Sequence, residues 1–149
     1  AGLHAAETGH LVFGTLHTID ASSTVDRMID AFPANQQEQV RAVLSIALKT
    51  IVAQTLVPHI SGKGRRAAYE ILHNVPAVSS LIREHKTNRI YSQLQISGKL
   101  GMCTLDDFLF RLYKKGDVSG EVVLQRAHYP EELRVKMMAM SEEAEEPVV

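Results

Sequence analysis

Apolar residues recur every three or four positions along much of this chain, and that spacing limits the possible folds more than any other feature. The longest series begins near Asn35 and ends before Pro58. It comprises Val40, Val43, Leu44, Ala47, Leu48, Ile51, Val52 and Leu56. This spacing predicts an amphipathic helix of about five turns with one face in a core. Shorter helices are predicted over residues 20–32, 77–85, 87–95, 105–115 and 119–128, and from residue 130 onward.

Two kinds of extended segment interrupt the helices. Residues 11–16 form an apolar run without polar alternation, which is typical of a parallel strand buried on both faces. Residues 57–60 and 67–72 flank a turn with two glycines and predict a β-hairpin, whose first strand Pro58 places at an edge. The predicted fold class is therefore α/β, mostly helical with a few strands.

Composition excludes several classes of protein. The 149 residues carry 16 basic and 17 acidic side chains, so the chain has no overall basic field for binding duplex DNA. Cys103, the single cysteine, excludes an intrachain disulfide and a multi-cysteine zinc site. No apolar run approaches the roughly 20 residues of a membrane helix. We expect residues 1–136 to be folded and residues 137–149 to form an acidic, disordered tail.

The chain opens on a short alanine-containing stretch that stops at Gly9, as a helix does at its end. A chain that begins by finishing a helix is expected to be a piece of a longer protein.

The sequence contains neither a Walker A loop nor histidines at the spacing of zinc ligands. Lys63 and Lys99 follow glycines, but neither has the upstream glycine or the following Ser or Thr of a Walker A loop. The seven histidines show no zinc-ligand spacing. If residues 11–16 form a strand, His10 and His17 lie roughly 23 Å apart and share no metal. Cys103 lacks the context of a nucleophile and is expected to be buried and inert.

Position on the predicted strand singles out a few polar side chains. Ligands of parallel sheets bind outside the carboxyl ends of the strands, where Thr15, His17 and Thr18 lie. A histidine there could donate a hydrogen bond to a phosphate or to a catalytic carboxylate. On the helix over residues 77–85, Arg83 and Glu84 lie beside the apolar face, although periodicity alone favours an ordinary surface helix there.

Longer strings resemble a known family. Residues 6–18, AETGHLVFGTLHT, resemble the His box of the secretion ATPase superfamily, and within it the retraction (twitching-motility) ATPase family of type IV pili. Residues 101–106, GMCTLD, resemble that family's GMQTLD. Residues 77–84 resemble its AIRNLIRE helix, with Ser79 and Ser80 in place of Arg-Asn. The resemblance spans roughly residues 5–132.

The resemblance implies the C-terminal part of a RecA-like P-loop ATPase core that works as a homohexamer. The complete protein would bind ATP with Mg²⁺, and hydrolysis of this ATP would drive pilus retraction. The resemblance implies a cytoplasmic location, peripheral to the inner membrane at the pilus base. An inner-membrane pilus platform protein is the implied partner, without nucleic acid and without membrane insertion.

The resemblance also assigns roles to individual residues. His17 would contact the γ-phosphate or a catalytic carboxylate, and no residue is assigned to a metal. The residues near the nucleotide would be His10, Thr15 and Thr18. The motor helix, required for retraction in the family, would contribute Leu81, Ile82, Arg83 and Glu84.

Motifs missing from this chain bear on its activity, and two other classes of protein remain as alternatives. In the family, the Walker A loop, the Walker B acidic residues and the arginine fingers precede the His box, so this chain alone is predicted to be inactive and to bind no ATP. The related pilus assembly ATPases carry a tetracysteine zinc site, which one cysteine disfavours. The alternative from another class is a non-enzymatic helical protein-interaction module, which leaves the string over residues 6–18 unexplained.

Overall fold

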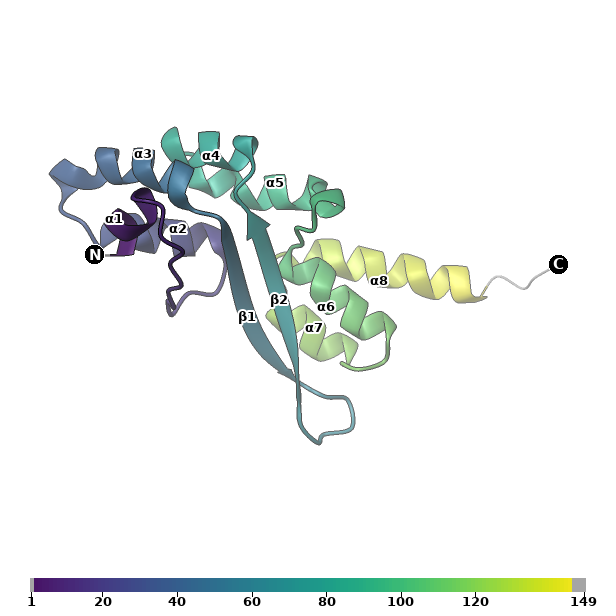
Figure 1. Ribbon diagram of the computed structural model, residues 1–149. Helices are drawn as coiled ribbons and strands as arrows, with labels where there is room; N and C mark the ends of the chain where they lie inside the picture. The colour runs from purple at the N-terminus through teal and green to yellow at the C-terminus, as the bar shows by residue number, and fades with distance from the viewer. Residues whose placement is uncertain (1, 146–149) are drawn as a thin grey trace. The chain divides into compact units, whose positions relative to one another are not determined.

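A computed structural model describes residues 2–145 (Figure 1). These residues divide into two compact units. Unit 1 holds the chain up to Gln54 together with Glu70–Thr104, and unit 2 holds Thr55–Tyr69 together with the chain from Leu105. The sequence pattern did not indicate this division, because the chain enters and leaves unit 2 within continuous strands.

Helices make up most of the described chain, and the predicted class, α/β with mostly helices, is confirmed. The helices of unit 1 are α1 (Gly2–Glu7), α2 (Ala21–Asp30), α3 (Gln37–Ala47), α4 (Pro76–Arg83) and α5 (Ile90–Ile96). Three short 3₁₀ helices, Ala34–Gln36, Thr87–Arg89 and Gly98–Leu100, accompany them. Unit 2 contributes α6 (Leu105–Lys114), α7 (Gly120–Arg126) and α8 (Pro130–Glu145).

The predicted hairpin is confirmed and is longer than expected. Strands β1 (Thr50–Pro58) and β2 (Arg65–His73) pair directly, and the amide of His59 donates to the carbonyl of Gly64 at 3.2 Å where the turn closes. Gly62 and Gly64 have φ values of 72° and 78°, a backbone region that favours glycine. Local turn chemistry therefore fixed this element.

The predicted five-turn helix is wrong beyond Ala47. Helix α3 ends there, Leu48 takes an extended ψ of 136°, and β1 begins at Thr50. Residues 50–57 are rich in β-branched side chains, which pack well on a pleated surface. Their burial alternates, with Ile51, Ala53 and Val57 inside and Val52 and Leu56 exposed. The helical spacing continued by coincidence into a strand.

The predicted parallel strand over residues 11–16 is also wrong for the structure described. These residues are irregular, and Leu11 and Phe13 are 78% and 89% exposed. A parallel strand needs hydrogen-bonded neighbours on its edges and helices on its faces. Within residues 2–145, neither strand of the hairpin pairs with this segment. Its apolar side chains are therefore left uncovered.

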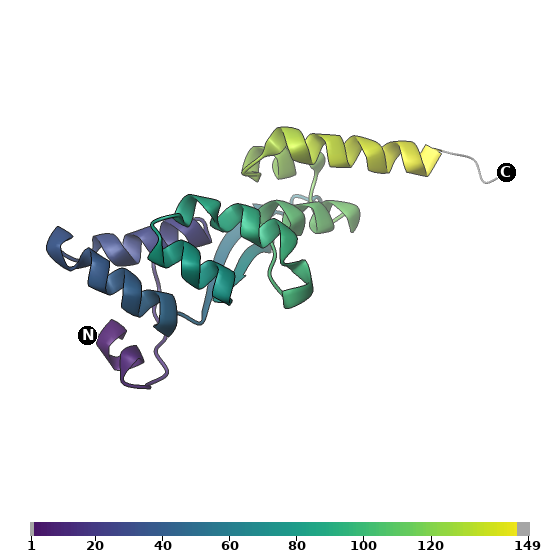
Figure 2. The ribbon, with the colours of Figure 1, turned by 90° about the horizontal axis from the view of Figure 1, so that it is seen from above.

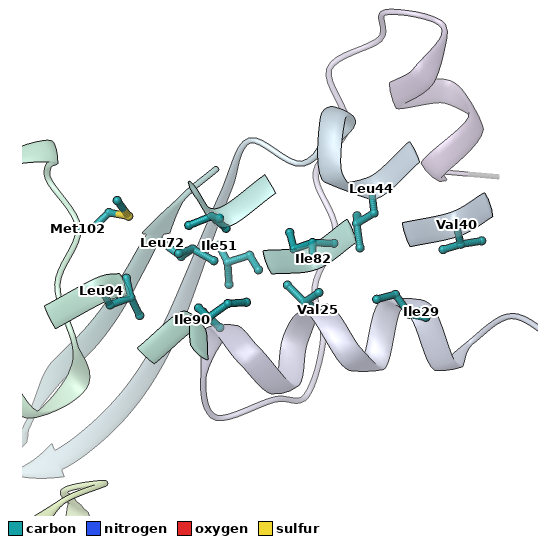
Figure 3. Packing of buried hydrophobic residues seen from close by; sticks show 12 residues of the cluster. Val25, Ile29, Val40, Leu44, Ile51, Leu72, Ile82, Ile90, Leu94 and Met102 are labelled. Carbon is teal, nitrogen blue, oxygen red and sulfur yellow. The ribbon is translucent and has the colours of Figure 1, made fainter. Parts of the chain in front are cut away.

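The core of unit 1 joins α2, α3, α4 and α5 to the base of the hairpin (Figure 3). Helices α3 and α4 lie side by side in both views (Figures 1 and 2). The fully buried members of this core are Ala21, Val25, Ile29, Leu72, Val78, Ile82 and Ile90. Burying a side chain of this size stabilises a fold by about 1.5–3 kcal/mol, so this core fixes α4 firmly against α3.

Unit 2 has its own core, formed by α6, α7, α8 and the turn end of the hairpin. The buried carboxylate of Asp106 accepts hydrogen bonds from the amides of His128 and Tyr129, at 2.7 and 2.8 Å. These contacts orient the segment from which α8 starts at Pro130. Helix α8 starts at residue 130, as predicted, and α6 ends at Lys114, shortly before Gly116, which has a φ of 73°.

Two details differ from the predicted helix ends. The helix predicted over residues 20–32 runs from Ala21 to Asp30, and the side chain of Asp20 caps its start by accepting from the amide of Ser23 at 2.6 Å. The acidic tail predicted as disordered is helical up to Glu145, because α8 continues through Met, Ala, Lys and Glu, which favour helices. Residues 146–149 of that tail lie outside the described residues.

Candidate functional site

The segment from His10 to Thr18 connects α1 to α2 as an open loop (Figures 1 and 2). At its start, Gly9 has a φ of 95°, and the amide of His10 donates to the carbonyl of Ala5 at 3.0 Å. The ring Nδ1 of His10 lies 3.2 Å from the hydroxyl of Thr8 and 3.3 Å from the carbonyl of Ala5. His10 is therefore tied to the end of α1.

The other end of this loop is tied to α2. The hydroxyls of Thr18 and Thr24 lie 2.6 Å apart, and Thr24 is buried. Thr15 and His17 are exposed and make no hydrogen bond or ion pair to any other described residue. The structure thus fixes the two ends of the predicted nucleotide-facing segment and leaves His17 open to solvent, one residue from an anchored threonine.

A partly open hollow of about 1820 Å³ lies in unit 1. The loop lines it together with parts of α2, α3 and the start of β1. Its lining is mainly apolar, with contributions from Leu11, Phe13, Met28, Ile46 and Ile51. Apolar linings favour burial of other apolar groups rather than of phosphates.

The predicted motor helix corresponds to α4. Val78 and Ile82 are fully buried and Leu81 packs against the same core, which confirms the predicted apolar face. Arg83 and Glu84 are exposed at the end of the helix. Of the four residues predicted for the motor helix, Leu81 and Ile82 therefore pack in the core, whereas Arg83 and Glu84 are exposed.

Polar contacts add a second connection between α4 and α3. The hydroxyl of Ser79 donates to the carbonyl of Ser45 at 2.6 Å, and the side-chain amide of Asn74 donates to that carbonyl at 2.9 Å and to the carbonyl of Leu48 at 3.0 Å. These bonds satisfy carbonyls that a helix leaves free at its C-terminal end. Ser79, which departs from the family string, thus has a structural role here, and the outer edge of the cluster reaches Arg83.

Glu84 is paired with Lys86 at 2.6 Å. This hydrogen bond and the charge of Lys86 hold the pKa of Glu84 below its ordinary value of 4.5. Because this pKa is lowered, the pair stabilises the fold at pH values above 4.5, and this stabilisation is lost as the pH falls through the lowered pKa.

We expect the Lys86→Met substitution to raise the pKa of Glu84 towards 4.5, measured by an NMR titration of its carboxyl carbon. An unchanged titration would contradict this pairing.

The remaining histidines and Cys103 have local partners or burial. His59 lies 3.6 Å from the carboxylate of Asp117, and His73 lies 3.0 Å from the hydroxyl of Thr50. His85 pairs with Glu38 and takes a φ of 58°, where α4 has ended. Cys103 is buried, as predicted, and its backbone bridges to Ile71. Within residues 2–145, no group of three or more His, Cys, Asp or Glu residues could hold a metal ion.

One buried carboxylate in unit 1 was not predicted from the sequence. Glu70 is 2% exposed, and its side chain accepts from the amide of Ala21 at 2.8 Å. Alternation along β2 could have found it, because Ala68, Glu70 and Leu72 share the buried face. A charged residue at an inward position of a strand indicates a specific partner.

The comparisons with known proteins agree with the resemblance. A family model described as a type II/IV secretion system protein matches residues 1–108. The chain is 50% identical over 129 residues to the type IV pilus retraction ATPase PilT of Pseudomonas aeruginosa, covering 87% of this chain and 37% of that protein. It is 47% identical over 131 residues to a twitching motility protein of Neisseria gonorrhoeae, covering 88% and 35%.

A solved structure supports the same likeness in three dimensions. The crystal structure of the pilus retraction motor PilT with bound ADP superposes with a TM-score of 0.78 at 47% identity, covering 89% of this chain and 37% of that one. The chain therefore spans about a third of the length of the proteins it matches. None of the described helices is long and apolar enough to cross a membrane.

Proposed function

The chain belongs to the type II/IV secretion system protein family, and on that premise we propose that it is the C-terminal part of an ATPase motor that powers type IV pilus retraction and twitching motility. The observation that carries the proposal is the unbroken string over residues 6–18 in a chain 50% identical to a pilus retraction ATPase. We use "complete protein" for this chain joined to the residues that precede it in such a motor.

His17 is the residue we assign to the chemistry. Phosphoryl transfer is accelerated mainly by positioning and by groups that neutralise charge on the phosphate oxygens. An exposed imidazole can donate a hydrogen bond to a γ-phosphate oxygen or to a catalytic carboxylate, and His17 is exposed and unpaired among the described residues. His10, Thr15 and Thr18 would lie near the nucleotide, with Thr18 fixing the loop to α2.

The phosphate cradle and the Mg²⁺ ligands would come from the rest of the complete protein. No Walker A string occurs in the 149 residues. We therefore propose that ATP with Mg²⁺ binds only in the complete protein, and that this chain alone neither binds ATP tightly nor hydrolyses it.

Exposed apolar side chains in unit 1 support the proposal that this chain is one part of a larger motor. Leu11, Phe13 and Ile46 are exposed around the mainly apolar hollow of unit 1. Contiguous apolar surface of this kind marks an interaction site in most proteins. We propose that the remaining part of the ATPase core covers this apolar surface in the complete protein.

The exposed end of α4 is the proposed output of the motor. Arg83 and Glu84 present charge at the end of a helix whose other face is fixed in the core. Through them the motor, acting as a homohexamer, would engage the inner-membrane pilus platform protein from the cytoplasmic side. The proposal includes neither nucleic-acid binding nor membrane insertion.

The test uses the complete protein and this chain side by side. We expect the purified complete protein to hydrolyse ATP and to have the mass of a hexamer by light scattering, and the 149-residue chain to show no turnover above buffer. A complete protein without ATP turnover would overturn the assignment as a motor and favour the interaction module. Turnover by the 149-residue chain would overturn the placement of the phosphate cradle outside it.

A further inference from the structure

Glu70 is a buried carboxylate to which the proposed motor chemistry assigns no role. It lies in β2 between the buried residues Ala68 and Leu72 and is itself 2% exposed. Burying a carboxylate is expensive unless hydrogen bonds satisfy it, so its position in the core implies a specific contact. The whole contact described below lies within unit 1.

One such contact is with the first residue of α2. The side-chain oxygen Oε1 of Glu70 accepts from the amide of Ala21 at 2.8 Å, across 49 residues of sequence. The first amides of a helix have no partner within the helix, and a carboxylate is a favourable acceptor for them. Glu70 therefore anchors the first residue of α2, next to the Asp20 cap, and Ala21 itself is fully buried.

A short series of hydrogen bonds leads from this point to the predicted nucleotide-facing loop. The hydroxyl of Thr24 donates to the carbonyl of Asp20 at 2.6 Å. Since that hydroxyl has one proton, the hydroxyl of Thr18 donates to Thr24 across their 2.6 Å contact. His17 is the next residue towards the N-terminus and makes no hydrogen bond of its own in the described part of the chain.

We propose that Glu70 is a positioning residue for His17. It holds the start of α2, α2 holds Thr18 through Thr24, and Thr18 sets where the backbone presents the His17 ring. The inference rests on the proposed function, in which His17 contacts the γ-phosphate or a catalytic carboxylate. Glu70 itself touches neither ATP nor metal in this proposal.

The kinetic test compares two substitutions of Glu70 in the complete protein. Glu70→Leu removes the acceptor at similar size, whereas Glu70→Gln keeps an oxygen for the amide of Ala21. We expect Glu70→Leu to lower kcat for ATP by about tenfold or more, with KM for ATP within about twofold, because misplacing a catalytic group slows the chemical step. Glu70→Gln should retain kcat within about threefold.

A double-mutant cycle separates positioning from general damage. In a His17→Ala background, Glu70→Leu should lower kcat by less than about twofold, because the group that it positions is already absent. An equal loss in both backgrounds would overturn the proposal, as would an unchanged kcat in the single variant.

Asp106→Asn provides the matched control. Asp106 is also a buried carboxylate that accepts backbone amides before a helix, but it belongs to unit 2. We expect this control to leave kcat per folded molecule unchanged. If it lowers kcat as far as Glu70→Leu does, the effect reflects general loss of a buried contact and the proposal fails.

Hydrogen exchange of the complete protein tests the same contact without reference to ATP. We expect Glu70→Leu, but neither Glu70→Gln nor Asp106→Asn, to accelerate exchange in peptides covering residues 17–24. Unchanged exchange there in Glu70→Leu would overturn the positioning role. If the complete protein lacks ATP turnover, the proposed function fails, and this measurement still decides whether Glu70 orders the loop that carries His17.

Discussion

Replacing His17 with alanine in the complete protein is expected to lower kcat for ATP hydrolysis by about 100-fold or more, the usual effect of removing one positioned donor or proton-transfer group from a reaction centre. The substitution removes the only ionisable ring at the α2 end of an exposed loop and no packing contact of the described core. ATP binding should change little, because the phosphate cradle lies elsewhere in the proposed motor. Steady-state turnover and equilibrium nucleotide binding measure the two quantities separately.

His4→Ala is the matched control for this substitution. His4 is an exposed histidine on α1, outside the residue 6–18 string, and the only described partner of its side chain is Glu7 on the same helix. Its replacement should leave kcat within about twofold, since exposed substitutions away from special contacts have small effects. Full activity in His17→Ala would remove His17 from the chemistry and favour a non-enzymatic interaction module.

Ile82→Ala is expected to produce the largest loss of stability, about 2–5 kcal/mol of the free energy of unfolding, because it removes three carbons from a fully buried site. Ile82 lies among Val25, Leu44 and Ile90 where α4 meets the core (Figure 3). Urea denaturation of the chain followed by circular dichroism measures the change. Ile82→Val, which leaves a smaller cavity, should lose only about 0.5–1.5 kcal/mol.

Arg83→Ala, one residue further along α4, changes an exposed side chain instead of a buried one. Arg83 is exposed and its side chain reaches only Ser79, at 3.3 Å, so stability should change by about 0.5 kcal/mol or less. In the complete protein this variant should nevertheless impair pilus retraction, since Arg83 is a proposed contact of the motor helix. Equal losses of stability in both variants would show that α4 is a structural element without a separate exposed function.

The elements predicted from sequence are those specified by neighbouring residues. The hairpin turn with its two glycines, the prolines at the starts of α4 and α8 and the serine cap of α7 all act within a few residues. The prediction failed where distant residues decide. Ile51 continues a helical series, but pairing with β2 makes it a strand residue. Residues 11–16 have a strand sequence and no strand beside them among the described residues.

The candidate site likewise combines features that neighbouring residues specify with a contact between distant residues. Periodicity separated the buried Ile82 from the exposed Arg83 and Glu84, because the faces of a helix follow from spacing alone. Neither periodicity nor resemblance indicated that Glu70 contacts α2. That contact joins residues 49 positions apart, and only the folded chain brings them together.

The hairpin shared by the two units has a consequence for genetic dissection of this protein. Unit 1 is interrupted in sequence by Thr55–Tyr69, which belong to unit 2, so no single break in the chain separates the units. A truncation after Thr104 would delete α6, α7 and α8 yet keep Val57 and Ala68, which are fully buried with them. Truncated in this way, the complete protein would carry newly bare apolar strands, and its loss of activity would report aggregation rather than the role of the deleted helices. Point substitutions, not deletions, are therefore the means of assigning roles to either unit.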